Sequence, residues 1–159
     1  MAKDNPAEFR ADVSKWVEKA KGNTRGVITE TIQDINFEII VNWPVLTGLS
    51  RGSWFAQIGS MPSGRGAAGA DPYARCNLVA AELELGQTYY MGNTADYSRR
   101  LELGFVGVDS LGRHYNQAGR YIVTTALAKA PRLAEAAAER IANGQLSGPR
   151  PVGATGSSV

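Results

Sequence analysis

The sequence is poor in the residues that build disulfides and metal sites, with one cysteine, Cys76, and one histidine, His114. A single cysteine cannot form an internal disulfide, so nothing in the sequence indicates an oxidising compartment. One imidazole and one thiol cannot supply the several ligands of a zinc centre. Apolar runs also stay well short of the roughly 20 residues that cross a bilayer. We therefore expect no disulfide, no metal and no membrane span.

A strong charge of one sign is also missing. The 17 basic and 15 acidic residues leave a net charge of only +2, which is too small by itself to favour nonspecific nucleic-acid binding. The charged N-terminal sequence MAKDNPAEFR lacks the apolar segment of a signal peptide, so we expect a protein made and kept in the cytoplasm of its cell. The length and the 43% hydrophobic content predict one globular domain over residues 1–145.

Helical periodicity dominates the N-terminal third. Asn5 and Pro6 are typical of a helix start, and Pro44 ends the pattern. Between them the apolar residues recur at helical spacing, first as Phe9, Val13, Trp16 and Ala20 and then as Ile28, Ile32, Ile35 and Ile39. Gly22 and Gly26 interrupt the pattern, so it fits either one long bent helix or two. The position of Trp16 on the stripe predicts a core residue.

The middle of the chain predicts two strands around one helix. Residues 53–61, SWFAQIGSM, and 86–93, GQTYYMGN, alternate as strands do. The Gly-rich residues 62–72 have no period and predict a flexible loop. Asp71 and Pro72 can start a helix that runs to about Glu84, and its pattern predicts three inward side chains, those of Leu78, Ala81 and Leu85.

Towards the C-terminus, Asp96 resembles the cap of a short helix that ends at Gly104. Residues 105–118 have several turn-prone sites and no clear period, which predicts a loop with at most one short strand. The clearest helix is expected at about 117–142, with Pro131 kinking or splitting it. Residues 146–159 have no pattern able to build a core and predict a disordered tail.

The sequence offers little catalytic chemistry. Cys76 lies in a helical pattern without an activating signature, so a dyad with His114 is poorly supported. The segment SGRGAAGA is not a phosphate-binding motif, and Glu82 and Glu84 do not share a helix face. We expect no catalytic residue and no cofactor. Arg99 and Arg100 fit either contacts with phosphate or a partner protein, or an exposed helix face with an Arg99–Glu102 pair. The triplet 113–115, RHY, could stack on a base but is more simply a loop tip.

Two segments together resemble a known family. PVLTGLSRGSW, residues 44–54, is similar to a Pro-Val-Asp-Thr-Gly-x-x-Arg-x-Ser-Trp pattern, and GNTADYSRRLELG, residues 92–104, is similar to an Asn-x-x-Pro-Tyr-Ala-x-x-Leu-Glu-aromatic-Gly pattern. Both patterns belong to the neck and tail-completion proteins of long-tailed bacteriophages. Leu46, Asp96, Ser98 and Leu103 depart from them. The matching positions are Pro44, Thr47, Gly48, Arg51, Trp54, Asn93, Tyr97, Leu101, Glu102 and Gly104.

The resemblance implies an α+β fold, in which a long N-terminal helix and a C-terminal helix pack on a small antiparallel β-sheet. It implies a structural corner at residues 44–54, with Gly48 at positive φ, Thr47 bonding the turn amides and Trp54 covering the long helix. Tyr97 and Leu101 would pack inward, and we hypothesise an Arg51–Glu102 salt bridge.

The resemblance further implies a non-enzymatic virion protein of the neck or head-proximal tail end, assembled in the host cytoplasm. It would act as a homo-oligomeric ring, six-fold as in tail tubes, and serve as a tail terminator or in head-tail joining. Its partners would be itself, the tail tube protein and the head-tail connector, with DNA only passing through the ring lumen and no membrane. Two alternatives remain open: a small nucleic-acid-binding or enzymatic phage protein, and a prophage remnant without a present role.

Overall fold

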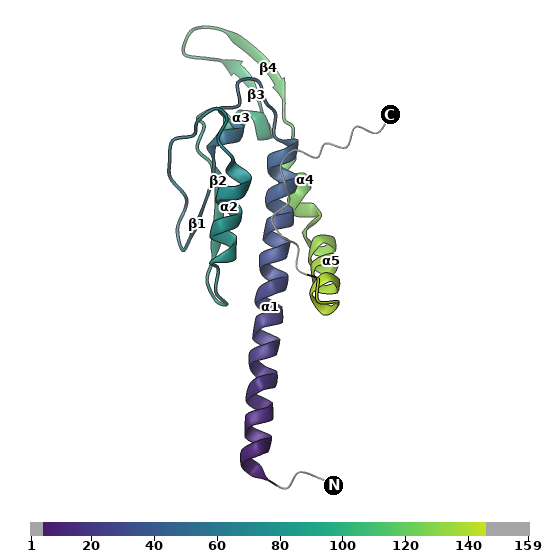
Figure 1. Ribbon diagram of the computed structural model, residues 1–159. Helices are drawn as coiled ribbons and strands as arrows, with labels where there is room; N and C mark the ends of the chain where they lie inside the picture. Colours follow the sequence, from purple (N-terminus) through teal and green to yellow (C-terminus); the bar gives the residue numbers. More distant parts are fainter. Residues whose placement is uncertain (1–4, 146–159) are drawn as a thin grey trace.

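A computed structural model describes residues 5–145 of the chain (Figure 1). The first element, α1 (Pro6–Asn42), is one continuous helix, which settles the choice between one helix and two. The Asn5 carboxamide oxygen accepts a hydrogen bond from the Ala7 amide at 3.1 Å and caps the N-terminus. Trp43 is extended, as a residue before proline prefers, and the helix ends there. The C-terminal part of α1 packs in the body of the molecule, whereas its N-terminal part projects from it (Figure 1).

The first sheet follows the corner. A short 3₁₀ helix, η1 (Arg51–Ser53), leads into β1 (Trp54–Ile58), which pairs antiparallel with β2 (Tyr89–Asn93). Between these strands lies α2 (Pro72–Ala81), which packs against both β1 and α1. The Asp71 carboxylate accepts a hydrogen bond from the Ala74 amide at 3.0 Å, so the predicted start of this helix is confirmed.

A second sheet occupies the region that the sequence predicted as a loop. After α3 (Ser98–Leu103), the strands β3 (Gly104–Val108) and β4 (His114–Ala118) form an antiparallel hairpin, so the loop prediction for residues 105–118 is wrong. Asp109 builds the turn, because its carboxylate accepts hydrogen bonds from the amides of Leu111 and Arg113, both at 2.9 Å. The mixed α+β class is confirmed, but the described residues form two separate two-stranded sheets instead of one.

The C-terminal helix is split where proline predicted a break. The pieces are α4 (Ile122–Ala128) and α5 (Ala130–Ala142), with Pro131 in the first turn of α5. α5 lies against α1, and Arg140 donates to Asp34 at 2.7 Å and to Glu30 at 3.3 Å across the contact. Both carboxylates are buried. Burial of the guanidinium tends to lower the pKa of Arg140, but the hydrogen bonds to Asp34 and Glu30 and their negative charges raise it above its ordinary value. The tail predicted at 146–159 lies outside the described residues.

The core sits where α1, α2, β1 and α4 meet. Its buried apolar members are Ile39, Ile40, Trp43, Trp54, Tyr73, Cys76 and Ala126. The rings of Trp43 and Trp54 meet edge to face, with centroids 4.9 Å apart. The burial of Trp54 that the resemblance implied is therefore confirmed, and Cys76 is buried beside it in the same cluster.

Four predicted core residues are instead exposed. Trp16 is 70% exposed and Leu78 is 68% exposed, and Ala81 and Leu85 also face outward. On α2 the buried residues are Pro72, Tyr73, Cys76, Asn77 and Ala80, which places the face of Leu78 outside. Helical spacing shows that residues share a face, but it does not say whether another element covers that face.

The segment 62–71 is irregular, as the sequence predicted, and it lies close against the corner. A Cβ on Gly66 would come within 2.0 Å of the Ser53 hydroxyl oxygen, and one on Gly52 would come within 2.0 Å of the Ala67 carbonyl oxygen. Backbone approaches this close explain the glycines at 52 and 66. No helix among residues 5–145 combines the length and the apolar character that crossing a membrane requires.

Candidate functional site

The corner at residues 43–54 closes the C-terminal end of α1. The Arg51 guanidinium donates through Nη2 to the carbonyl of Val41 at 2.8 Å and to that of Trp43 at 3.2 Å. Carbonyls at the C-terminal end of a helix have no partner within the helix, and a positive charge there interacts favourably with the negative end of the helix dipole. Arg51 therefore serves as a helix cap.

Small polar groups shape the turn itself. Gly48 has φ 81°, the positive value that the resemblance implied. The Thr47 hydroxyl oxygen accepts a long hydrogen bond from the Leu49 amide at 3.4 Å. The Trp43 indole N–H donates to the Ser50 hydroxyl at 2.8 Å, and both groups are buried. The role of Ser50 was missed at the sequence level, because a serine in a turn is too common to single out.

The second motif segment meets the first in space. Asn93 is the register partner of Trp54 in the first sheet, and its side-chain amide donates to the Ser50 carbonyl at 2.7 Å. The Thr94 amide donates to the Ser53 carbonyl at 2.9 Å. Two segments that lie some forty residues apart in the chain thus form one hydrogen-bonded unit.

Glu102 and Gly104 join this unit to the C-terminal helices. The Glu102 carboxylate accepts from the amides of Val123 at 3.1 Å and Thr124 at 3.0 Å, so it caps α4. Burial tends to raise the pKa of Glu102, but the hydrogen bonds from Thr124 and Val123 lower it below its ordinary value. Gly104 has φ 83°, and a Cβ there would lie 2.7 Å from the Gln117 carbonyl oxygen, so only glycine fits.

These partners contradict the hypothesised Arg51–Glu102 salt bridge. Arg51 binds the end of α1 and Glu102 binds the start of α4, and the two are not paired among the ion pairs of residues 5–145. The sequence showed two charges in related motifs, but each satisfies helix-terminal backbone groups instead. Helix ends favour charged side chains of the matching sign, but the sequence alone does not show which helix end lies near either residue.

The remaining motif residues divide between core and surface. Leu101 packs against the core, as implied, whereas Tyr97 is partly exposed at the N-terminus of α3. Tyr97 itself occupies the cap position predicted for Asp96, and the cap has no side-chain hydrogen bond. Arg100 lies over the Phe105 ring at 4.1 Å, a cation–π contact within the chain.

The catalytic candidates do not come together. Cys76 is buried in α2, while His114 is exposed at the start of β4. Burial raises the pKa of the Cys76 thiol to about 12, although Arg75 nearby lowers it, so the thiol stays protonated and unreactive. Within the described part of the chain no group of three or more His, Cys, Asp or Glu residues could hold a metal ion.

The hollows on the surface are open, and they differ in the polarity of their linings. A groove of about 240 Å³ has walls from α1, the first sheet and α4, and its lining is Ile32, Ile35, Asn36, Ile39, Trp54, Tyr89, Met91, Val123 and Leu127. A second hollow of about 360 Å³ lies beside the corner and includes Arg65, Asp96 and Tyr97. Neither holds a nucleophile beside a base, the arrangement that acyl or phosphoryl chemistry requires.

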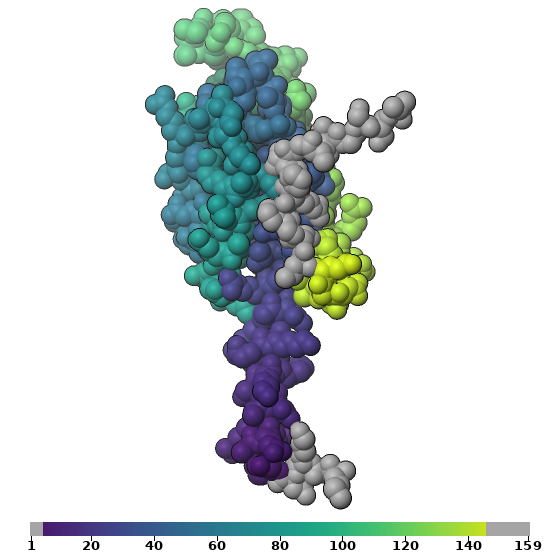
Figure 2. All heavy atoms as spheres, in the orientation of Figure 1, coloured from purple at the N-terminus to yellow at the C-terminus, as the bar shows by residue number. Residues whose placement is uncertain are grey.

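Exposed apolar side chains lie on several parts of the surface, among them the two elements that project from the body. The β3–β4 hairpin stands out at one end of the molecule (Figures 1 and 2), and Val106, Val108 and Leu111 are exposed on it. The N-terminal part of α1 stands out at the other end and carries exposed Phe9, Val13 and Trp16. Apolar surface on projecting elements is typical of protein contacts.

The candidate site therefore consists of two projecting surfaces, the β3–β4 hairpin and the N-terminal part of α1, on a body that contains the hydrogen-bonded corner. Comparison with known protein families, with curated proteins and with solved structures gave no match for this chain.

Proposed function

We propose that this chain is a structural subunit of a bacteriophage virion, at the neck or at the head-proximal end of the tail, and that it works by assembly. The observation that carries the proposal is the contact between the two motif segments. Asn93 bonds Ser50 and pairs with Trp54, so the residues that resemble the tail-completion pattern form one unit in this fold.

The chemistry of the motif residues supports a structural role. Arg51 and Glu102 each cap a helix, Gly48 and Gly104 take positive φ at turns, and Trp54 is 4% exposed. Polar groups that satisfy backbone atoms in this way are not available to a substrate. The motif is therefore best explained by the scaffold that it builds.

The open sheet edges support assembly into a ring. Each of the two sheets has two strands, so every strand has one edge without a strand partner among residues 5–145. Such edges recruit further strands, and a closed ring of like subunits covers them head to tail. The hairpin offers both an open edge and exposed Val106 and Val108. The six-fold count rests on the resemblance alone.

The test is complementation of particle assembly. Phage lysates made without this protein are expected to hold separate heads and tails, or tubes of wrong length, and added purified protein should restore joined particles visible by electron microscopy. Normal infectious particles in its absence would overturn the proposal. So would a defined complex of the free protein with a small substrate, or sequence-independent DNA binding that survives physiological salt.

A pair of variants makes the test specific to the hairpin. Val106 is 77% exposed on β3 and Leu78 is 68% exposed on α2, so replacing either with Glu should leave the fold intact. We expect Val106→Glu to lose most of the rescue and Leu78→Glu to keep it. Equal rescue by both variants would remove the hairpin from the assembly contacts.

A further inference from the structure

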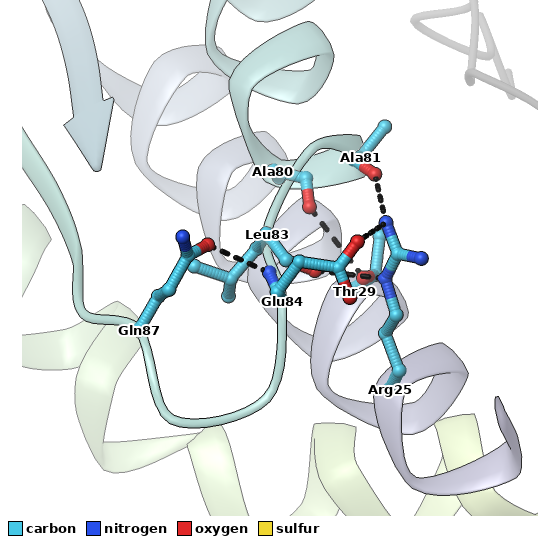
Figure 3. Close-up of polar contacts among 7 residues, drawn as sticks. All are labelled: Arg25, Thr29, Ala80, Ala81, Leu83, Glu84 and Gln87. Atoms are coloured by element: carbon cyan, nitrogen blue, oxygen red, sulfur yellow. Dashed lines mark hydrogen bonds and ion pairs between the residues drawn. The ribbon is translucent and has the colours of Figure 1, made fainter. Parts of the chain in front are cut away.

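The N-terminal part of α1, residues 6–24, is here called the stalk. Within the described chain, the hydrogen bonds and ion pairs from α1 to other elements begin at Arg25, which donates to the carbonyls of Leu83 at 2.8 Å and Ala81 at 3.1 Å and pairs with Glu84 (Figure 3). A Cβ built on Gly22 would meet nothing within 4 Å, whereas one on Gly26 would lie 3.0 Å from Ile141. The body of the molecule therefore begins at about Arg25.

The stalk carries an apolar stripe with nothing from the body on it. Phe9 is 67% exposed, Trp16 is 70% exposed, and Val13 lies between them on the same face. The stripe continues to Ala20 with alternating steps of four and three residues, the spacing of a coiled-coil seam. A helix of this length is marginal in water by itself, and packing of its apolar face is what ordinarily stabilises it.

The order of large and small side chains along the stripe favours a second stalk in antiparallel orientation as its partner. If a second stalk lies antiparallel, Phe9 faces Ala20 of the second copy, and Val13 faces Trp16 of the second copy. Each large side chain then meets a small one, which is how helix seams fill space evenly. A parallel pair in register would instead stack Trp16 on Trp16 and leave Ala20 against Ala20.

The charges beside the stripe favour the same arrangement. Asp12 and Lys19 lie two turns apart on one flank, and neither belongs to an ion pair of residues 5–145. In the antiparallel register Asp12 lies diagonally across the seam from Lys19 of the second copy, about two residues along the axis, and the two-fold axis repeats the pair. In a parallel pair Asp12 would face Val17, and both charges would stay without a partner.

The length of the stalk also fits. In this register residue 6 of the second copy faces residue 23, so the two helices overlap over roughly 27 Å and stop just before the body begins at Arg25. The two bodies then lie at opposite ends of the paired helices and leave the hairpins free.

We infer that two copies of this chain associate through their stalks as an antiparallel, two-fold pair, in which Trp16 packs on Val13 and Asp12 on Lys19. This surface differs from the sheet edges of the proposed ring. The pair and the ring can therefore be tested separately.

The experiment is sedimentation of the full chain from about 1 to about 200 µM, a span that brackets a weak to moderate interface. The wild-type particle is expected to have twice the mass of the Trp16→Glu particle, whether or not rings also form. Trp16 is exposed, so this variant should fold normally, as circular dichroism can confirm. Leu78→Glu is the matched control, and we expect it to keep the wild-type mass. An unchanged mass for Trp16→Glu would overturn the inference, as would a monomeric wild type throughout.

Charge reversal tests the orientation. Asp12→Lys alone and Lys19→Asp alone are each expected to weaken association by roughly fivefold, the scale for two exposed ion pairs, and the double reversal should restore it. A parallel pair predicts no effect from any of the three. Tryptophan fluorescence gives an independent readout, because Trp43 and Trp54 are already buried and only Trp16 gains burial on pairing. Its emission should shift to the blue with concentration, and a constant spectrum would count against the pair.

Discussion

Replacing Trp54 with alanine tests whether the corner is a structural element or a binding surface. Trp54 is 4% exposed and belongs to the core cluster with Ile39, Ile40, Trp43 and Cys76. Removing a buried Trp or Phe side chain commonly destabilises a protein by about 3–5 kcal/mol. The edge-to-face contact with Trp43 adds about 0.5–1.5 kcal/mol beyond buried area. We therefore expect Trp54→Ala to lower the free energy of unfolding by about 4 kcal/mol.

Trp54→Phe separates the ring contact from the indole N–H. The Nε1 atom of Trp54 is buried without a hydrogen-bond partner in the described structure, and such a group costs about 1–3 kcal/mol. Phenylalanine keeps an aromatic edge for Trp43, lacks this N–H and leaves a smaller cavity. We expect the loss for Trp54→Phe to stay below about 2 kcal/mol.

The assay is urea unfolding followed by far-ultraviolet circular dichroism at one low chain concentration, so that pairing of stalks does not contribute. Trp16→Ala serves as the control and should change the free energy of unfolding by less than about 0.5 kcal/mol, because Trp16 is exposed. A loss below about 1 kcal/mol for Trp54→Ala would refute the reasoning. Equal losses at positions 16 and 54 would do the same.

Three further predictions concern the hairpin and the core. Gly104→Ala places a Cβ 2.7 Å from the Gln117 carbonyl oxygen at φ 83°, so in urea unfolding it should cost at least about 1 kcal/mol more than Gly112→Ala, where φ is 76° but the space is open. Hydrogen bonds from the side chain and backbone of Arg113 hold the pKa of Asp109 at about 2, so the turn is stabilised fully above the ordinary value of 3.8 and loses this support as the pH falls towards 2. Carboxyl NMR should give that midpoint, and one near 3.8 would contradict it. Iodoacetamide at about pH 8 should label Cys76 only as fast as the protein unfolds, since burial raises the pKa of the thiol to about 12; fast labelling of folded protein would contradict this.

Local signals made much of the fold predictable. Asn5 with Pro6 set the start of α1, Pro44 set its end, and Asp71 set the start of α2. Each of these residues acts through its own backbone or its nearest neighbours, so the sequence alone is sufficient. The positive φ of Gly48 was predictable for the same reason.

The failures share a different cause, because they depend on elements that are distant in the chain. Trp16 and Ile39 each belong to an apolar stripe with helical spacing. Only Ile39 is covered by other elements, because it packs in the core cluster with residues of α2 and the first sheet. The hairpin was missed because β4, with the sequence HYNQA, is polar and exposed, and its register depends on the turn that Asp109 organises. The roles of Arg51 and Glu102 required knowing which helix ends lie nearby.

The continuity of α1 gives the molecule the mechanics of a lever. Its 37 residues make a rod of about 55 Å that runs from the projecting stalk into the body of the molecule (Figure 1). Gly26 is wedged against Ile141, but Gly22 stands clear of other atoms and weakens the helix by about 1 kcal/mol relative to alanine. Bending is therefore concentrated just outside the body. A sideways load on the stalk is expected to tilt it about Gly22, while a load along the axis passes through the continuous helix into the body, where α1 packs against α2, α4 and α5.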